Sequence, residues 1–174
     1  MPSFKTVRRV PYPPEAILDL VADVARYPEF VPLCEGMTVL SRQSEPNGDE
    51  VIVARMAVGY GPLRESFTSR VAVSRALRQI NVTYLQGPFR SMHNRWTFRP
   101  DGAGCEVEFQ INYEFSSLAL QLLLGSLFDR VFRKFAEAFE LRARKVYGAG
   151  VALVDAAGNV LSTVTSPAIL RSST

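Results

Sequence analysis

The amino-acid sequence predicts an α+β domain in which a curved antiparallel sheet wraps around one long C-terminal helix. Three observations lead to this fold class. A short segment near the start has helical spacing of its apolar residues, the central region alternates apolar and polar residues, and residues 117–147 return to a helical period.

The composition is that of one globular domain. The chain has 174 residues, of which 47% are hydrophobic and 21% charged, and this is enough apolar material for a single core. Its 20 basic and 17 acidic residues are interspersed, so the charge does not indicate a nucleic-acid interface, although an anionic membrane surface or nucleic acid remains compatible with it.

The first ten residues lack the apolar stretch of a secretory signal, and no run approaches the 18 apolar residues of a membrane span. A cytoplasmic protein is therefore expected. Its two cysteines, Cys34 and Cys105, form neither a CxxC pair nor a zinc framework and are expected to be reduced thiols.

The start of the chain predicts a strand over Thr6–Val10 and a helix over Glu15–Ala25. Prolines suit a first helical turn, which explains Pro11–Pro14 between the two. Pro28 is expected to end the helix, because a proline restricts the residue before it.

Residues 23–34 (DVARYPEFVPLC) follow this helix and are rich in proline and aromatic side chains. Pro28 and Pro32 predict an extended segment, and its carboxylates, Asp23 and Glu29, have no histidine or cysteine nearby in sequence. We interpret the segment as a lid or plug over one mouth of the curled sheet, not as a catalytic loop.

The central region predicts an antiparallel meander of about six strands with one dry and one wet face. Its period becomes two from about Met37, and residues 105–115 alternate without exception. Turn signals separate the runs: Pro46–Asp49, Gly59–Pro62, Gln86–Pro88 and Pro100–Gly104.

Residues 117–147 predict a long helix with a wide apolar stripe, roughly 45 Å long at about 1.5 Å per residue. The domain is expected to span residues 1–148. Residues 149–174 carry two charges and are expected to form a mobile tail, with a small hairpin over 151–154 and 159–164 as the alternative.

Three segments resemble one known family. They are DVARYPEFVPLC (23–34), FRSMHNRWTFRP (89–100) and FAEAFELRARKVYG (135–148), in this order. Over residues 2–148 the chain resembles the coenzyme Q-binding proteins of the START-like superfamily, also called polyketide cyclase/dehydrase-like.

The resemblance implies a helix-grip fold with an apolar tunnel between the sheet and the helix. It also implies binding of ubiquinone or a related isoprenoid lipid and support of respiration, as a carrier or chaperone and not as a catalyst. A bacterial relative is a ribosome association toxin, so the resemblance is also compatible with a ribosome-binding factor.

Inward-facing apolar and aromatic residues of the sheet, the lid and the long helix are the candidate lining of the tunnel. They are Phe30, Val31, Phe67, Tyr84, Trp96, Phe98, Phe109, Tyr113, Leu124, Phe128, Val131, Phe132 and Phe135. Plain core packing is the alternative for most of them. Their rings could also stack on a planar headgroup.

Three polar residues occupy strand positions that alternate in step with the inward-facing apolar residues, and they are candidates for ligand recognition. Glu65 lies between Leu63 and Phe67, and Asn94 lies between Met92 and Trp96; the hydroxyl of Tyr84 is a third candidate. A buried polar group needs a partner, so each is either satisfied within the protein or recognises a ligand oxygen such as a quinone carbonyl.

No catalytic, metal or cofactor motif is present. The single histidine, His93, shares the parity of the polar face, and there is no Gly-rich phosphate loop. A non-enzymatic protein with ubiquinone as its bound ligand and no required cofactor is expected, while a small cyclase-like enzyme using only Tyr and Glu stays a third hypothesis.

The long helix carries candidates for a second contact. Arg130, Arg133 and Lys134 could meet phospholipid headgroups at the inner membrane or ribosomal RNA phosphates, or form an ordinary solvated face. Residues 118–128 are apolar nearly all round, which predicts either a helix start packed on both sides or an exposed apolar entrance. The oligomeric state is left open.

Overall fold

The structure, a computed structural model, describes residues 3–148, 153–154 and 160–162. Within them, seven strands form one antiparallel sheet in the order β1-β7-β6-β5-β4-β3-β2. The strands are β1 Ser3–Val10, β2 Cys34–Ser44, β3 Glu50–Tyr60, β4 Leu63–Ser74, β5 Gln79–Gln86, β6 Phe89–Asp101 and β7 Gly104–Phe115. The predicted six-strand meander is confirmed as β2–β7, and β1 adds an edge strand beside β7.

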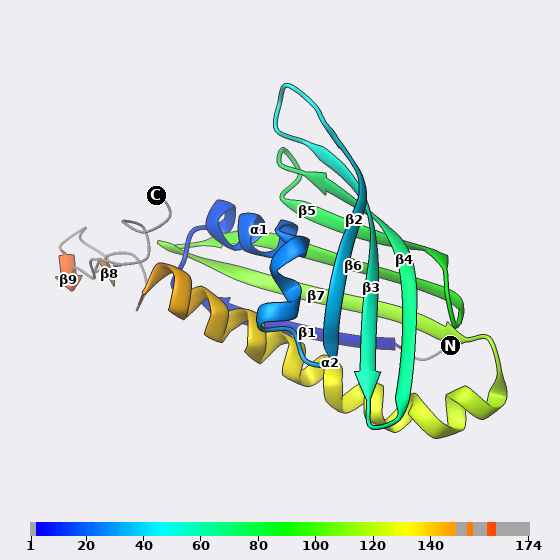
Figure 1. Cartoon of the computed structure of the whole chain (residues 1–174). Helices are drawn as coiled ribbons and strands as arrows, with labels where there is room; N and C mark the ends of the chain where they lie inside the picture. Colours follow the sequence, from blue (N-terminus) through cyan, green and yellow to red (C-terminus); the bar gives the residue numbers. More distant parts are fainter. Residues whose placement is uncertain (1–2, 149–152, 155–159, 163–174) are drawn as a thin grey trace.

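The sheet is bent around the long helix α2, Leu118–Tyr147. Figure 1 shows β1 and β7 running along the helix and β2–β4 crossing it. Ser117 caps the helix, its hydroxyl accepting a hydrogen bond from the backbone N–H of Leu120. The α+β helix-grip architecture predicted from the sequence is therefore confirmed.

The first helix is shorter than predicted. It spans Pro14–Ala22 (α1) and is followed by a 3₁₀ helix, η1, over Val24–Glu29. Pro28 was expected to stop the helix and to hold the segment extended, and both expectations are wrong. The proline lies inside η1, where its missing N–H removes no required donor near the end of a short helix.

The core lies between α2, α1 and the inner face of the sheet. β7 alternates between buried and half-buried residues along its whole length, as its sequence predicts. The outer face of the sheet is polar and lined by ion pairs such as Arg99–Glu108 and Lys5–Glu108. No helix within the described residues is long and apolar enough to span a membrane.

Beyond the domain, β8 (Leu153–Val154) pairs antiparallel with β9 (Val160–Ser162). This pairing falls within the hairpin that the sequence offers as an alternative for the tail. The rest of residues 149–174, for which mobility was expected, lies outside the described residues.

Candidate functional site

A cavity separates the inner face of the sheet from α2. Its empty volume is about 1390 Å³, including a part that is open to solvent. Concave spaces of this kind, enclosed by a sheet and a helix, are where small-molecule sites usually form.

The sheet supplies the floor of the cavity through rows of neighbouring residues. Met56 pairs with Phe67 across β3 and β4, and Val82 of β5 pairs with Asn94 of β6. The helix supplies the roof, mainly with large side chains: Leu120, Leu124, Leu127, Phe128, Val131, Phe132, Phe135 and Phe139. These walls are almost entirely apolar, as expected of a site for a hydrophobic ligand.

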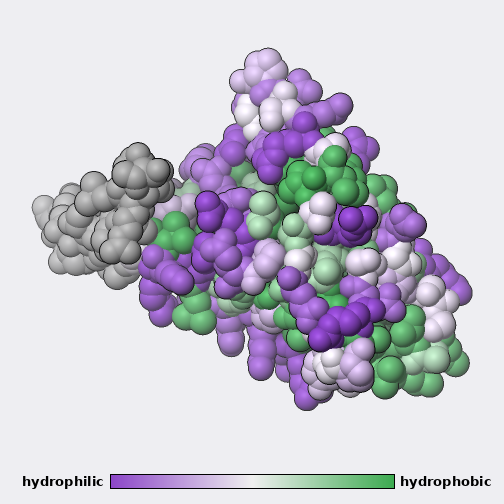
Figure 2. Space-filling model, viewed as in Figure 1, coloured by the Kyte–Doolittle hydropathy of each residue, from purple (hydrophilic) through white to green (hydrophobic). Residues whose placement is uncertain are grey.

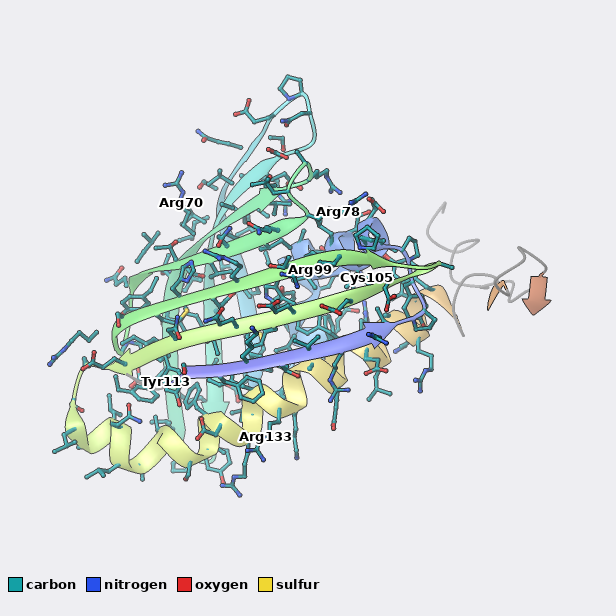
Figure 3. The ribbon with its side chains drawn as sticks, turned by 180° about the vertical axis from the view of Figure 1, so that it is seen from behind. Arg70, Arg78, Arg99, Cys105, Tyr113 and Arg133 are labelled. Carbon is teal, nitrogen blue, oxygen red and sulfur yellow. The ribbon has the colours of Figure 1, made fainter. Side chains whose placement is uncertain are left out.

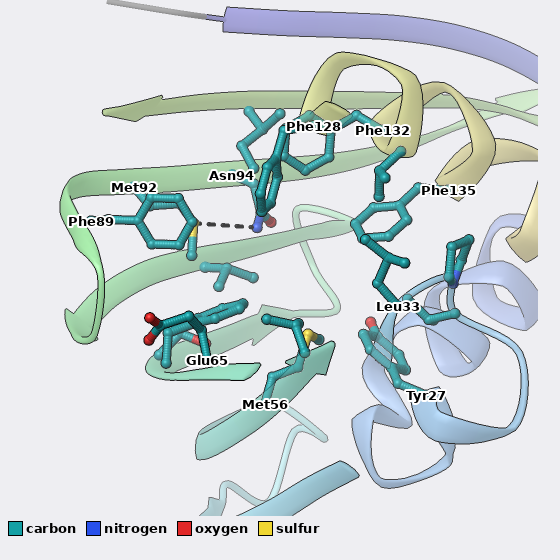
Figure 4. Close-up of a pocket in the computed structure, with 18 of the residues that line it drawn as sticks. Tyr27, Leu33, Met56, Glu65, Phe89, Met92, Asn94, Phe128, Phe132 and Phe135 are labelled. Atoms are coloured by element: carbon teal, nitrogen blue, oxygen red, sulfur yellow. Dashed lines mark hydrogen bonds between the residues drawn. The ribbon is translucent and has the colours of Figure 1, made fainter. Parts of the chain in front are cut away.

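A few polar side chains interrupt this lining. The carbonyl oxygen Oδ1 of Asn94 is buried and has no hydrogen-bond partner among the described residues, while its Nδ2 lies 3.8 Å from the sulfur of Met92. Glu65 also lines the cavity, and the described part of the chain offers its carboxylate no hydrogen-bond or ion-pair partner. Figure 4 shows the two side chains coming from different parts of the curved sheet.

The segment after α1 closes one side of the cavity. Val24, Tyr27, Val31, Pro32 and Leu33 lie in its wall. This placement agrees with the interpretation of residues 23–34 as a lid, although the backbone is helical there and not extended.

The lid is fastened to the C-terminal half of α2. The ring of Phe30 lies edge-on to that of Phe139, with 5.1 Å between the ring centres. The guanidinium of Arg142 lies over the ring of Phe30, 5.1 Å from its centre. The same arginine donates from Nη2 to the carboxylate of Glu29 at 3.2 Å. Glu29 therefore links the end of η1 to α2 through this ion pair.

Most of the predicted lining residues do lie on the cavity wall. They are Val31, Phe67, Trp96, Phe109, Leu124, Phe128, Val131, Phe132 and Phe135, together with the predicted polar pair Glu65 and Asn94.

Four predicted lining residues lie elsewhere. Phe30 anchors the lid, as described above, and Tyr84 is half-buried near the end of β5, where its hydroxyl accepts from the N–H of Phe89. Phe98 and Tyr113 are buried with 1% exposure, but they pack into the solid core. Burial raises the pKa of Tyr113 to about 12, and its hydroxyl lies 3.4 Å from Asp129.

Several lining residues were not predicted, notably Met37, Met56, Phe89, Met92 and Phe115. Phe89 and Met92 face inward together although they are three positions apart. An irregularity in the β6–β7 pairing between Phe89 and Ser91 shifts the alternation there. A sequence offers no reliable signal for such a shift.

The predicted basic residues of the helix are exposed. Arg130, Arg133 and Lys134 take part in none of the ion pairs within the described residues. Figure 3 places Arg133 on the side of α2 that faces away from the sheet.

The titratable groups do not form a metal or nucleophile centre in the described ranges. No group of three His, Cys, Asp or Glu there could hold a metal ion. Cys34 and Cys105 are free and buried, and burial raises the pKa of each thiol to about 11. His93 lies on the polar side of β6, where burial and the neighbouring Arg95 lower its pKa.

Comparisons with known proteins agree with this geometry. The family described as polyketide cyclase/dehydrase and lipid transport matches residues 10–140. The ribosome association toxin RatA of Vibrio cholerae is 36% identical over 140 residues, which cover 80% of this chain and 93% of the toxin. The mitochondrial coenzyme Q-binding protein homolog B of Xenopus laevis is 33% identical over 139 residues, which cover 77% of this chain and 54% of that protein.

Solved structures give the same picture. An 18 kDa protein from Caulobacter crescentus is 36% identical, with a TM-score of 0.70 over 86% of this chain and 100% of that one. A START superfamily protein from Mycobacterium smegmatis has a TM-score of 0.69 at 21% identity, over 82% of this chain and 97% of that one, and shows the fold alone.

Proposed function

The chain belongs to the polyketide cyclase/dehydrase and lipid transport family of the START-like fold, and from this premise we propose that it binds and carries a ubiquinone-type isoprenoid lipid without transforming it. The apolar cavity between the sheet and α2 is the observation that carries the proposal. The proposed setting is cytoplasmic, with loading and release at the inner face of a respiratory membrane. No additional cofactor is part of the proposal.

The lining favours a ligand with a long apolar part and few polar atoms. Burial of an isoprenoid chain stabilises the complex by about 25 cal/mol per Å² of apolar area, before the ordering of the ligand is subtracted. The family resemblance of residues 2–148 to coenzyme Q-binding proteins and the printed name of the Xenopus laevis relative support a quinone as this ligand.

In this proposal, polar contacts with Asn94 and Glu65 orient the bound ligand within the apolar cavity. The Oδ1 of Asn94 is buried and has no partner among the described residues, so a ligand hydroxyl that donates to it supplies a missing hydrogen bond. Its Nδ2, which has only a weak contact with the sulfur of Met92, can donate to a quinone carbonyl oxygen. Aromatic walls next to it, among them Phe89 and Phe128, suit a planar headgroup.

The direct test is organic extraction and mass spectrometry of protein purified from a quinone-producing host. A near-stoichiometric, chemically unaltered quinone is expected. The blocking variant is Ala54→Phe, because Ala54 lies in the cavity floor and is 3% exposed. Ala72→Phe is its matched control, since Ala72 lies on the adjacent strand outside the cavity lining.

The expected result is quinone in the wild type and in the Ala72→Phe variant, and little in a folded Ala54→Phe variant. Wild-type protein that carries no quinone, and takes up none from quinone-loaded vesicles, would refute the carrier function. A product formed from the ligand during incubation would instead indicate an enzyme.

Ribosome association is a second candidate function. The relationship to the ribosome association toxin over most of both chains favours it. Arg55 and Arg70 are exposed on β3 and β4, take part in no ion pair of the described chain, and lie diagonally across the two strands because Arg55 pairs with Thr68. Figure 3 shows Arg70 on the outer side of the sheet.

Cosedimentation with large ribosomal subunits at increasing salt tests this candidate. Cations on RNA phosphates predict binding that weakens steeply with salt. The double variant Arg55→Ser/Arg70→Ser is expected to reduce both the binding and its salt dependence, whereas Ala54→Phe is expected to leave both unchanged.

A further inference from the structure

The start of α2 exposes a group of large apolar side chains. Leu118, Leu122 and Leu123 have exposed fractions of 74%, 77% and 69%, the three largest among the exposed hydrophobic residues of the described chain. Tyr60, at the end of β3, is also exposed. Figure 2 shows the apolar surface over the start of α2 as a green area at the lower right.

This apolar surface adjoins the cavity. Leu120 and Leu124, on the neighbouring face of the same helical turns, line the cavity, and so do Tyr60 and Leu63 on either side of the β3–β4 turn. The exposed leucines therefore lie next to the part of the cavity wall that Leu120 and Leu124 form. A ligand that leaves past this wall passes from one apolar environment to the other.

The next turns of α2 present cations on the same face. Leu122 and Arg133, like Leu123 and Lys134, are eleven residues apart, which is close to three helical turns. Arg130, Arg133 and Lys134 are exposed and take no part in an ion pair among the residues described. The nearby carboxylates have other partners: Asp129 accepts a hydrogen bond from Tyr113, and Glu137 pairs with Arg8.

We propose that this face of α2, with the β3–β4 turn, docks the protein on a bilayer that contains anionic phospholipids. Leu118, Leu122 and Leu123 enter the boundary between headgroups and acyl chains, and Arg130, Arg133 and Lys134 contact the phosphates. An apolar face with flanking cations is the general pattern of helices that lie in a membrane interface.

The pairing of leucines with cations selects a lipid surface over other occupants. RNA phosphates would attract the three cations but leave the leucines in water, where their exposure has no compensation. A second copy of the chain in a two-fold contact would bring the cations of both copies into the same interface. A membrane containing anionic phospholipids provides an apolar environment for the leucines and phosphates for the cations.

Vesicle flotation with the purified chain tests the proposal. The vesicles contain phosphatidylcholine with or without phosphatidylglycerol and no quinone, so the outcome does not depend on the proposed ligand. The wild type is expected to float with the anionic vesicles. Leu122→Ser/Leu123→Ser is expected to lower the partition coefficient at least tenfold, and each of Arg130→Ser, Arg133→Ser and Lys134→Ser about fivefold.

Leu77→Ser is the matched control. Leu77 is 67% exposed in the turn between β4 and β5, so it lies neither on α2 nor in the cavity lining, and its replacement is expected to leave flotation unchanged. Three results would overturn the proposal: a wild type that stays unbound, an equal loss in the control variant, or a wild-type dimer that Leu122→Ser/Leu123→Ser separates. Circular dichroism confirms that each variant is folded.

Discussion

Replacement of Asn94 by leucine should stabilise the empty protein and weaken ligand binding. The reason is the buried Oδ1 of Asn94, which has no hydrogen-bond partner among the described residues. A buried polar atom without a partner destabilises a fold by about 1–3 kcal/mol. Leucine has a similar size and no polar atom, so Asn94→Leu removes this penalty inside an apolar wall.

The expected gain is about 1–2 kcal/mol in the free energy of unfolding, because the amide still keeps its weak contact with Met92 in the wild type. For a chain of this size, about 1 kcal/mol corresponds to roughly 2–4 °C in Tm. Ligand affinity should fall about two- to tenfold, the effect of losing one hydrogen bond of about 0.5–1.5 kcal/mol.

Both quantities can be measured on delipidated protein. Thermal unfolding followed by circular dichroism gives the Tm. Trp96 is the chain's single tryptophan and lines the cavity, so quenching of its fluorescence by a quinone reports the affinity. Ser91→Ala is the control, since Oγ of Ser91 is also buried without a partner in the described chain but lies outside the cavity lining.

The control variant should not lose affinity. A lower Tm for Asn94→Leu would show that the amide supports the fold, and unchanged affinity would show that it does not contact the ligand. Either result contradicts the assignment of Asn94 as the polar recognition group.

Three further outcomes are expected. Phe128→Ala removes contacts with four aromatic rings; it should lower stability by about 3 kcal/mol and reduce quinone retention in a folded variant, as extraction can measure. Gly125→Ala should raise Tm by about 2–4 °C, because alanine favours a helix and the added Cβ meets only the flexible end of Gln121. Gly87→Ala should lower Tm, because φ is +144° there and the added Cβ would lie 2.6 Å from the Cβ of Phe67. Unfolding curves that rank the two variants in the opposite order would refute this reasoning. Cys34 and Cys105 should react with iodoacetamide at pH 8 at least a hundredfold more slowly than ordinary thiols, because a pKa of about 11 leaves only about 0.1% thiolate; reactivity should rise with pH toward that pKa, and equal rates for native and urea-unfolded protein would contradict it.

The alternation of residues was sufficient to predict the faces of the strands. In β7 the residues from Cys105 to Phe115 that were expected to face inward are all buried or nearly so. The stripe of α2 was likewise correct, because a 30-residue helix must bury its apolar side against something. Both features depend on the spacing of apolar residues within one strand or helix, and a single sequence is enough to show that spacing.

Position along a strand was harder to predict. Phe98 and Tyr113 face inward as expected, yet they pack in solid core beside the cavity. The alternation of residues along a strand shows which face of the sheet a side chain lies on. It does not show how far the sheet is from the helix at that residue. The prediction of an extended backbone for residues 23–34 was wrong for a different reason, since Pro28 is compatible with a 3₁₀ helix as well as with the end of a helix.

Two aromatic clusters explain why the cavity exists between such well-packed elements. Near the start of α2, Phe128 contacts the rings of Phe89 and Phe115 at 6.3 and 5.2 Å. Toward its C-terminal end, Phe139 contacts Trp96 at 5.0 Å and Tyr27 at 5.3 Å. Large rings thus hold the helix away from the sheet at two places.

Small residues lie in the floor of the cavity. Ala54 and Ser69 are paired across β3 and β4, both are nearly fully buried, and both line the cavity. Neither is large enough to fill the space that the aromatic clusters create, and no neighbouring side chain can move in, because the sheet fixes their spacing. The cavity therefore follows from the register that brings Ala54 beside Ser69, and that register is a property of the folded sheet which residue types alone do not reveal.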